Sequence, residues 1–238
     1  TSFEITIYAR DVYENQVTSF TTFATLSDLT TTISPTQTGN FTTGSWTGNV
    51  TITKSQTDVK ITAAQSGKSG QSNIFNVNHG ALASYQIAAI STQAAGEPFQ
   101  ITVTALDANA NIATQFTGTV NISDLTGTIA PTISNNFGGG KWSGNVTITA
   151  VRQNDRITVT NTGGCQTGQS NLFTVIASSV DHFDINTISS PQVAGAPFQI
   201  SITAKDAADN VVTGFTGTAL LSDLSGTISP TTTTNFIS

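Results

Sequence analysis

The sequence predicts an all-β chain that is built from tandem sandwich domains of about 100 residues each. The stretch Phe99–Asp124 occurs three times with small changes, starting at Phe3, Phe99 and Phe198, and these starts lie 96 and 99 positions apart. Within each copy, apolar and polar residues alternate, which is the period of a half-buried strand. Charged residues are only 9% of the chain, and Thr and β-branched apolar residues, which favour strands, are abundant.

The length of the repeat indicates whole domains. Solenoid repeats are about 20 to 50 residues long and cannot bury a core alone, whereas a small β domain has about 100 residues. We therefore predict three domains in series: residues 1–80 lack their first strand, residues 81–179 are complete, and residues 180–238 lack their C-terminal half. Both ragged ends are those expected of a window cut from a longer array.

The second copy predicts seven short strands separated by turn signals. They are expected at residues 85–91, 98–106, 115–123, 128–133, 142–150, 156–161 and 170–176. In the first copy, strands 59–62 and 73–77 are expected to flank the loop 65–70. Seven strands, with Trp46 and Trp142 at matching positions, indicate a seven-stranded immunoglobulin-like β-sandwich. The absence of a cysteine pair excludes the antibody type.

The tryptophan strand defines the predicted core. Trp142, Gly144, Val146 and Ile148 share one face of their strand. We therefore predict that Trp142 is buried between the two sheets. Its expected neighbours are Val103, Phe116, Val146 and Ile148.

Composition argues against several classes of function. The net charge of −6 and the pI near 4.5 argue against nucleic acid and anionic membranes, because both attract a basic patch. No apolar run approaches the roughly 20 residues that cross a bilayer. Cys165 is the only cysteine, so no disulfide framework is expected.

No arrangement of side chains predicts catalysis, and we expect the chain not to be an enzyme. His79 and His182 lie in connectors, away from any carboxylate pair. The glycines at 138–140 precede Lys141 without the spacing of a phosphate-binding loop, and a strand follows where a helix is required. Lys205 is expected on the solvent face of its strand, which argues against an internal isopeptide bond. No cofactor is predicted beyond a possible Ca²⁺ ion.

The turn at residues 107–111, Asp-Ala-Asn-Ala-Asn, resembles the D-x-N-G-N turn of bacterial immunoglobulin-like repeats in invasin- and intimin-type surface proteins. The Gly of that pattern is Ala110 here, Glu14 in the first copy and Asp209 in the third. The sequence motifs FTGT, SDLTGTI-P-T and W-x-GNVTIT also resemble repeats of large prokaryotic, including archaeal, surface proteins. The resemblance covers the whole chain. It implies an extracellular array that spaces, adheres or assembles, and it carries no catalytic residues.

On these grounds we predict a structural repeat array of a prokaryotic extracellular surface or filament protein. It would act as a stalk, an adhesin scaffold or a self-assembling fibre subunit, and its partners would be neighbouring repeats, copies of itself and host or cell-surface glycans. The alternative is a carbohydrate-binding accessory module of a secreted protein, which needs exposed aromatic rings. Tyr8, Tyr13 and Phe23 are candidates, but the second copy has no aromatic residues at the equivalent positions.

Acidic and amide side chains recur in the turns and are candidate Ca²⁺ ligands at the junctions between copies. The candidates are Asp28, Asp107, Asn111, Asp124, Asp206, Asp209 and Asn210. Because the chain reverses at alternate poles of a sandwich, the Asp28 turn is expected to approach the Asp107 turn, and the Asp124 turn the Asp206 turn. Capping of the turns by these side chains is the favoured alternative. A divalent cation or a hydrogen-bonded turn pair is therefore expected to stiffen each junction.

Two further sets of residues carry predictions. Four glycosylation sequons occur, at Asn40, Asn49, Asn121 and Asn145, although Thr-rich strands also produce such triplets by chance. Four apolar side chains are expected to project away from the cores of their domains. They are Tyr8, Phe23, Leu106 and Leu220. We predict that at least part of this outward set is covered in the native assembly.

Overall fold

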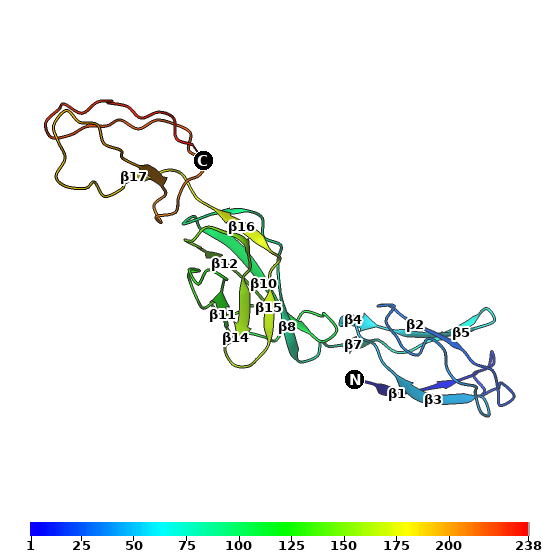
Figure 1. Ribbon diagram of the computed structural model, residues 1–238. Coiled ribbons are helices and arrows are strands. Elements are labelled where there is room, and N and C mark those ends of the chain that lie inside the picture. The colour runs from blue at the N-terminus through cyan, green and yellow to red at the C-terminus, as the bar shows by residue number, and fades with distance from the viewer. Residues whose placement is uncertain (238) are drawn as a thin grey trace. The chain divides into compact units, whose positions relative to one another are not determined.

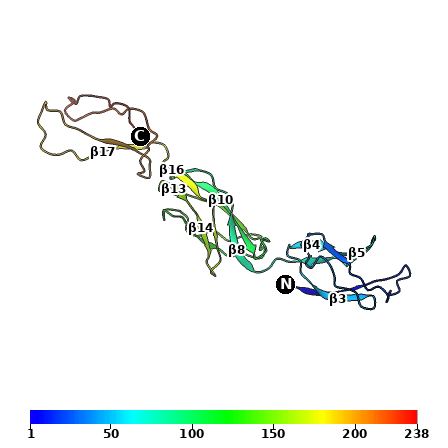
Figure 2. The same ribbon diagram turned by 45° about the vertical axis from the view of Figure 1, so that its right-hand side comes forward.

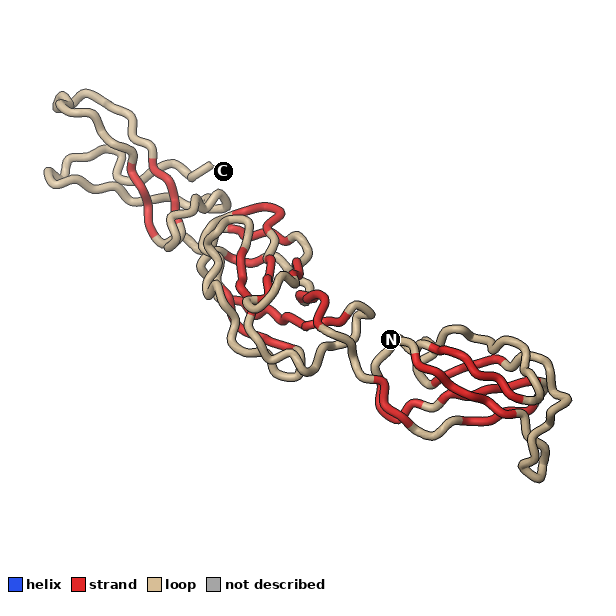
Figure 3. Tube along the Cα trace, turned by 90° about the horizontal axis from the view of Figure 1, so that it is seen from below, coloured by secondary structure: helices blue, strands red, loops and turns tan. Residues whose placement is uncertain are grey.

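The computed structural model describes residues Thr1–Ile237. Figure 3 shows these residues as strands joined by loops, and none of them is helical. The all-β prediction is therefore confirmed. No helix of this part of the chain is long and apolar enough to cross a membrane.

The chain forms two compact units, which are described separately. The first unit comprises Thr1–Ser84 and Ala105–Phe116. The second comprises Tyr85–Thr104 and the residues from Thr117 onward. The turn that follows β10 (Phe99–Asp107), a strand of the second copy, thus belongs to the first unit. The domain boundaries at residues 80 and 179 stay a prediction.

The first unit contains two antiparallel layers (Figures 1 and 2). In one layer β1 (Phe3–Tyr8) pairs with β3 (Ser45–Val50). The other layer has β2 (Thr25–Asp28), β5 (Ile61–Gln65) and β6 (Lys68–Gln71) in that order. A separate two-stranded sheet is formed by β4 (Gln56–Val59) and β7 (Phe75–Val77). The core holds Val50 and Ile52 packed with Leu26 and Ile61, so the two layers face each other across it.

The second copy repeats this arrangement. One sheet has the order β12 (Lys141–Val146), β10 (Phe99–Asp107), β8 (Leu82–Ile87), and another has β11 (Val120–Ser123), β14 (Thr158–Asn161), β15 (Thr167–Gln169). A third sheet has β13 (Arg152–Asp155), β16 (Phe173–Ile176) and the parallel β9 (Gln93–Ala94). In the third copy β17 (His182–Ile185) pairs with β18 (Ile202–Lys205).

Equivalent strands pair in the same register. Phe3 lies opposite Val50 in β1 and β3, and Phe99 lies opposite Val146 in β10 and β12. Each of these pairings is shifted by 96 positions, as the sequence repeat is. The first two copies therefore place equivalent side chains on equivalent faces.

Trp142 is buried, with 8% of its surface exposed, and it lies opposite Val103 in the pairing of β12 with β10. Val103 and Ile148 are fully buried on the same face. The predicted burial of Trp142 is confirmed. Gly144 makes room for the ring, because a Cβ built at that position would lie 2.4 Å from the indole.

The predicted loop 65–70 is wrong, because this segment forms a hairpin. Residues of β5 and β6 pair across the two-residue turn Ser66-Gly67. Both turn residues have positive φ, at 46° and 77°, which is the geometry of the tight hairpin turn that matches strand twist. The Ser-Gly pair was the signal in the sequence.

Three strand predictions also need correction. The strand predicted at 115–123 begins only at Val120, and residues 128–133 form isolated bridges around Pro131, which has no N–H to donate. The strand predicted at 59–62 is divided, since β4 and β5 pair in different sheets. Within β4, Asp58 has a φ of 56° and lies where the pairing with β7 shifts register between Gln56 and Val59. Asn154 has the same conformation at the equivalent register shift between β13 and β16 in the second copy.

Candidate functional site: the junction turns

Asp107 ends β10, and its carboxylate organises the turn that follows. Oδ1 accepts hydrogen bonds from the backbone N–H groups of Asn109 and Asn111 at 2.8 and 2.9 Å. Oδ2 accepts from the side-chain amide of Asn111 at 2.9 Å and from the backbone N–H of Gly80 at 2.7 Å. Only 3% of Asp107 is exposed. Burial acts to raise the pKa of Asp107, but these hydrogen bonds together outweigh it and lower the pKa to about 2.

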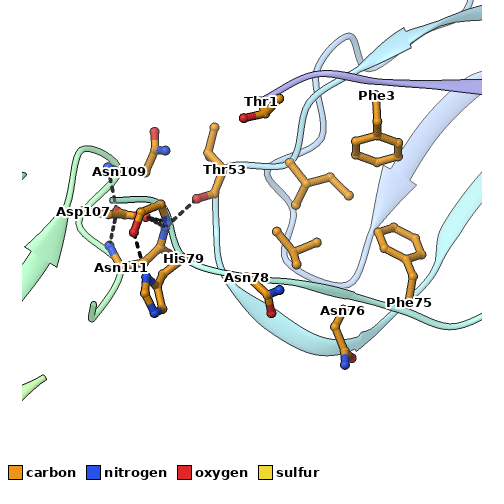
Figure 4. A pocket seen from close by; sticks show the side chains of 13 residues that line it. Thr1, Phe3, Thr53, Phe75, Asn76, Asn78, His79, Asp107, Asn109 and Asn111 are labelled. Carbon is orange, nitrogen blue, oxygen red and sulfur yellow. Dashed lines mark hydrogen bonds between the residues drawn. The ribbon is translucent and has the colours of Figure 1, made fainter. Parts of the chain in front are cut away.

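The side chain of Asn111 binds a second segment of the first unit (Figure 4). Its Nδ2 donates to the carbonyl of Thr53 at 2.8 Å, and its Oδ1 accepts from the N–H of Ser55 at 2.9 Å. The amide thus pairs with one backbone acceptor and one backbone donor, two residues apart. Asn111 therefore fastens the chain that leaves β3 to the Asp107 turn.

The Asp28 turn is also hydrogen-bonded to this segment, through Thr32. Asp28 accepts from the N–H of Thr32 at 3.0 Å, and Thr32 Oγ1 accepts from the N–H groups of Thr53 and Lys54 at 3.2 Å each. The segment Thr53–Ser55 thus lies between the Asp28 turn and the Asp107 turn, and it is bonded to both. We call the Asp107 turn with Asn111 and its bound segment the first latch.

The second unit contains an equivalent latch. Asn210 Nδ2 donates to the carbonyl of Thr149 at 2.7 Å, and Asn210 Oδ1 accepts from the N–H of Val151 at 3.2 Å. Asp206 is fully buried and accepts from the N–H of Ser178 at 3.1 Å, as Asp107 does from Gly80. Burial raises the pKa of Asp206, and the hydrogen bonds from Asn210, Ser178 and Ala208 lower it further than burial raises it. Thr128 Oγ1 accepts from the N–H groups of Thr149 and Ala150, in the role of Thr32.

The candidate cation ligands are occupied by hydrogen-bond donors. An ionised carboxylate has about four acceptor sites, and Asp107 uses three for donors of its own turn and one for the N–H of Gly80. Asp28 and Asp124 accept from the turn residues that follow them. Asp209 instead faces His182, 3.3 Å from its Nε2. Among residues Thr1–Ile237, no group of three or more His, Cys, Asp and Glu side chains is arranged to hold a metal ion. Ca²⁺ stays a prediction, and a bound ion would have to displace these donors.

Asp155 is a buried carboxylate that sequence reasoning missed. It is fully buried, Oδ1 accepts from the N–H groups of Leu125 and Arg156, and Oδ2 has no hydrogen-bond partner in the described part of the chain. Burial raises the pKa of Asp155, and the charge of Asp124 raises it further. The equivalent residue of the first copy is Val59, also fully buried, so comparison of the copies was the signal.

We expect Asp155→Asn to raise the free energy of unfolding by about 1–2 kcal/mol at pH 7. Because the folded-state pKa lies above the unfolded value, ionisation of Asp155 costs stability as the pH rises through the folded pKa. The gain from the substitution should therefore shrink as the pH falls through the folded pKa and be lost below the unfolded value of about 4. Urea unfolding from pH 3 to pH 7 measures it, with Asp58→Asn, an exposed site, as the control. A variant no more stable than the native chain at pH 7 would contradict this expectation.

The remaining predicted sites are exposed, except Leu106, which is half-buried. The sequon residues Asn40, Asn49, Asn121 and Asn145 are all exposed, and their glycosylation stays a prediction. Of the outward apolar set, Tyr8, Phe23 and Leu220 are 50%, 40% and 86% exposed, and Leu106 is half-buried. Sequence reasoning missed the bound segments of the latches, Thr53–Ser55 and Thr149–Val151. Their only signal is the repeated T-I-T that follows each tryptophan strand.

No protein-family model and no curated protein matches the sequence. Among solved structures, the chain is similar to invasin, a bacterial integrin-binding protein, with 15% identity and a TM-score of 0.38 over 92% of this chain and 46% of that one. Domains 4–9 of the surface layer protein SbsC match with 18% identity and a TM-score of 0.30, over 91% and 33%. The D0-D1 domain of intimin matches with 12% identity and a TM-score of 0.32, over 74% and 90%.

These matches concern proteins of the kind that the turn motifs resemble. The chain spans less than half the length of the invasin and SbsC structures. At this level of identity and score, no activity or ligand is transferred from them. The immunoglobulin-like class rests on the strand pairings and the repeated register described above.

Proposed function

We propose that the chain is a structural array of immunoglobulin-like repeats from a prokaryotic extracellular surface or filament protein, in which the latches stiffen each junction. Its work would be mechanical: it would hold other parts of the protein, or copies of itself, at a set spacing. The polar side chains of the two latches bind backbone groups, which is a structural and not a catalytic use of them.

The observation that carries this proposal is the repetition of the latch. Asn111 and Asn210 each bind a carbonyl and an N–H two residues apart, and Asp107 and Asp206 each bind a connector N–H. A flexible linker would need none of these contacts. Paired hydrogen bonds to one planar amide fix its orientation, so each latch restrains rotation of the segment that it binds.

The test removes both amides. We expect the double variant Asn111→Ala, Asn210→Ala to show a broader distribution of maximum dimensions in small-angle X-ray scattering than the native chain, because the bound segments are released. Asn15→Ala removes an exposed amide of the same turn type and should leave the distribution unchanged. A distribution for the double variant that matches the native one would contradict the stiffening role.

Two further measurements separate the parts of the proposal. Scattering of the native chain with Ca²⁺ and with a chelator should give the same distribution if the hydrogen bonds alone stiffen the junctions. Surface exposure is tested by treating intact source cells with a protease that cannot enter them. Loss of the full-length protein from treated cells is expected, and complete protection would contradict an extracellular location.

A further inference from the structure

The turn Asp11–Asn15 in the first copy is built like the two latch turns. Asp11 Oδ1 accepts from the backbone N–H groups of Tyr13 and Asn15 at 2.9 Å each, and the side-chain amide of Asn15 donates to Asp11 Oδ2 at 3.1 Å. Glu14 has a φ of 65°, as Ala110 has a φ of 61°. The turn is therefore preformed in the geometry that holds Asn111 in place.

This third turn holds no segment within the described residues. Asp11 and Asn15 are exposed, whereas Asp107 and Asp206 are 3% and 0% exposed. Asn111 and Asn210 bind Thr53–Ser55 and Thr149–Val151, but no residue of Thr1–Ile237 donates to Asn15 Oδ1. Asn15 thus presents, in an ordered turn, the side-chain amide groups with which Asn111 and Asn210 bind their segments.

The side chains around this turn differ from those of the latch turns. Tyr8, Val12 and Tyr13 are 50%, 87% and 82% exposed, where the second copy has Thr, Ala and Asn. The Arg10 guanidinium lies 5.8 Å from the centre of the Tyr8 ring and donates to the carbonyl of Glu14 at 2.7 Å. Tyrosine and arginine are enriched among the residues that dominate binding energy at interfaces.

The first latch shows the surroundings that Tyr13 would have if its turn bound a strand end in the same way. The equivalent residue, Asn109, lines an open pocket of about 370 Å³ whose wall includes Thr1, Phe3, Phe75 and His79 (Figure 4). Phe3 and Phe75 form an edge-to-face pair with ring centres 5.8 Å apart, and Phe99 and Phe173 form the equivalent pair at 6.2 Å. A tyrosine ring entering such a pocket would add aromatic contact that Asn109 cannot.

We propose that the Asp11–Asn15 turn docks the strand end of another repeat of this kind. Asn15 would bind the carbonyl and N–H of the segment equivalent to Thr149–Val151, and Tyr13 would enter the pocket beside the phenylalanine pair of that repeat. The partner is defined by its chemistry: an extended segment after a tryptophan strand, with an open pocket alongside. This inference rests on the proposed function, since it extends the latch to a third site.

The first test places a known strand end before the turn. Residues 81–197 are joined directly to Phe3, so that Pro197 precedes Phe3 as it precedes Phe198 in the native chain. Exchange of the Asn15 side-chain amide protons is then followed by NMR in the native and the extended chain. We expect exchange to slow by at least about tenfold in the extended chain, because both protons become hydrogen-bonded in a protected site.

Asn111 and Asn210 serve as internal controls in the same spectra. If they stay protected while Asn15 exchanges as fast as in the native chain, docking at Asn15 is refuted and the proposed function stands. If none of the three is protected, the latches themselves fail and the proposed function fails with them. Shifts of the Tyr8 and Tyr13 signals on adding a mixture of oligosaccharides, with Asn15 unprotected in the extended chain, would also overturn the proposal in favour of a sugar site.

The second test moves the turn instead of the strand end, and it needs no extension. The triple variant Ala108→Val, Asn109→Tyr, Ala110→Glu gives the occupied first latch the side chains of the first copy's turn. We expect Asn111 to keep its protection and the introduced tyrosine to be shielded from a water-soluble fluorescence quencher. Loss of Asn111 protection, with Asn210 unchanged, would show that the turn of the first copy cannot seat a strand end.

Discussion

Replacing Trp142 by alanine is expected to lower the free energy of unfolding by about 3–5 kcal/mol. The ring lies in the core of the second copy, 8% exposed and opposite the fully buried Val103. Its removal loses the transfer free energy of a large side chain and leaves a cavity that fixed sheets cannot close. A typical domain has only about 5–15 kcal/mol of stability, so this loss would bring the second copy close to unfolding at room temperature.

Urea unfolding followed by far-UV circular dichroism measures this loss. Trp46→Ala is the matched control, because Trp46 occupies the same register in the first copy but is only half-buried. Its removal should therefore cost less. Equal losses for the two variants, or a loss below about 1 kcal/mol at Trp142, would contradict the idea that burial of this ring stabilises the second copy.

The sequence was sufficient to predict this core, because alternation along a strand is a local property. Val103, Trp142, Val146 and Ile148 could be assigned to one buried face from parity alone, and the structure buries all four. The repeat strengthened the assignment, since Phe3 and Phe99 begin strands with the same pattern. Fold class and buried face therefore followed from the pattern of side chains.

Features that depend on backbone geometry could not be predicted in this way. The chain passes from one sheet to another between β4 and β5, and the residues of this stretch carry no local pattern that indicates the change. The hairpin at Ser66-Gly67 was mistaken for a loop because Ser is an uncommon residue at a position with positive φ. The first error concerns where the chain changes its strand partner, which depends on residues distant in sequence, and the second concerns the local geometry of one turn.

The sequence predicted the turns of the latches but not the segments that these turns bind. The Asp-x-x-x-Asn turns were visible because their side chains are distinctive, and they led to the expectation of either a cation or a hydrogen-bonded turn pair. The bound half consists of backbone groups of Thr53–Ser55, which any sequence presents. Asp155 was missed for a different reason, since it lies in a strand of mixed polar residues and only its equivalence to Val59 marks it as buried.

The stability of the first unit is expected to fall in acid through Asp107. The pKa of this carboxyl is about 2 in the folded protein and near 3.8 when exposed, so the folded state holds the ionised form more tightly. The stabilisation is therefore fully present above about pH 5 and is lost as the pH falls through the folded pKa. The difference between the two values corresponds to about 2–3 kcal/mol.

Asp107→Asn should show this loss at neutral pH, because a neutral amide oxygen accepts hydrogen bonds more weakly than a carboxylate and its NH₂ group opposes the N–H of Gly80. We expect the variant to be about 2–3 kcal/mol less stable than the native chain at pH 7, and the two to converge near pH 2. Urea unfolding at half-unit steps from pH 2 to pH 7 measures both curves. Asp11→Asn, in the same turn type but exposed and without a connector donor, should lose much less. Curves for the native chain and Asp107→Asn that stay parallel from pH 7 to pH 2 would mean that the ionised carboxylate of Asp107 does not hold the first latch together.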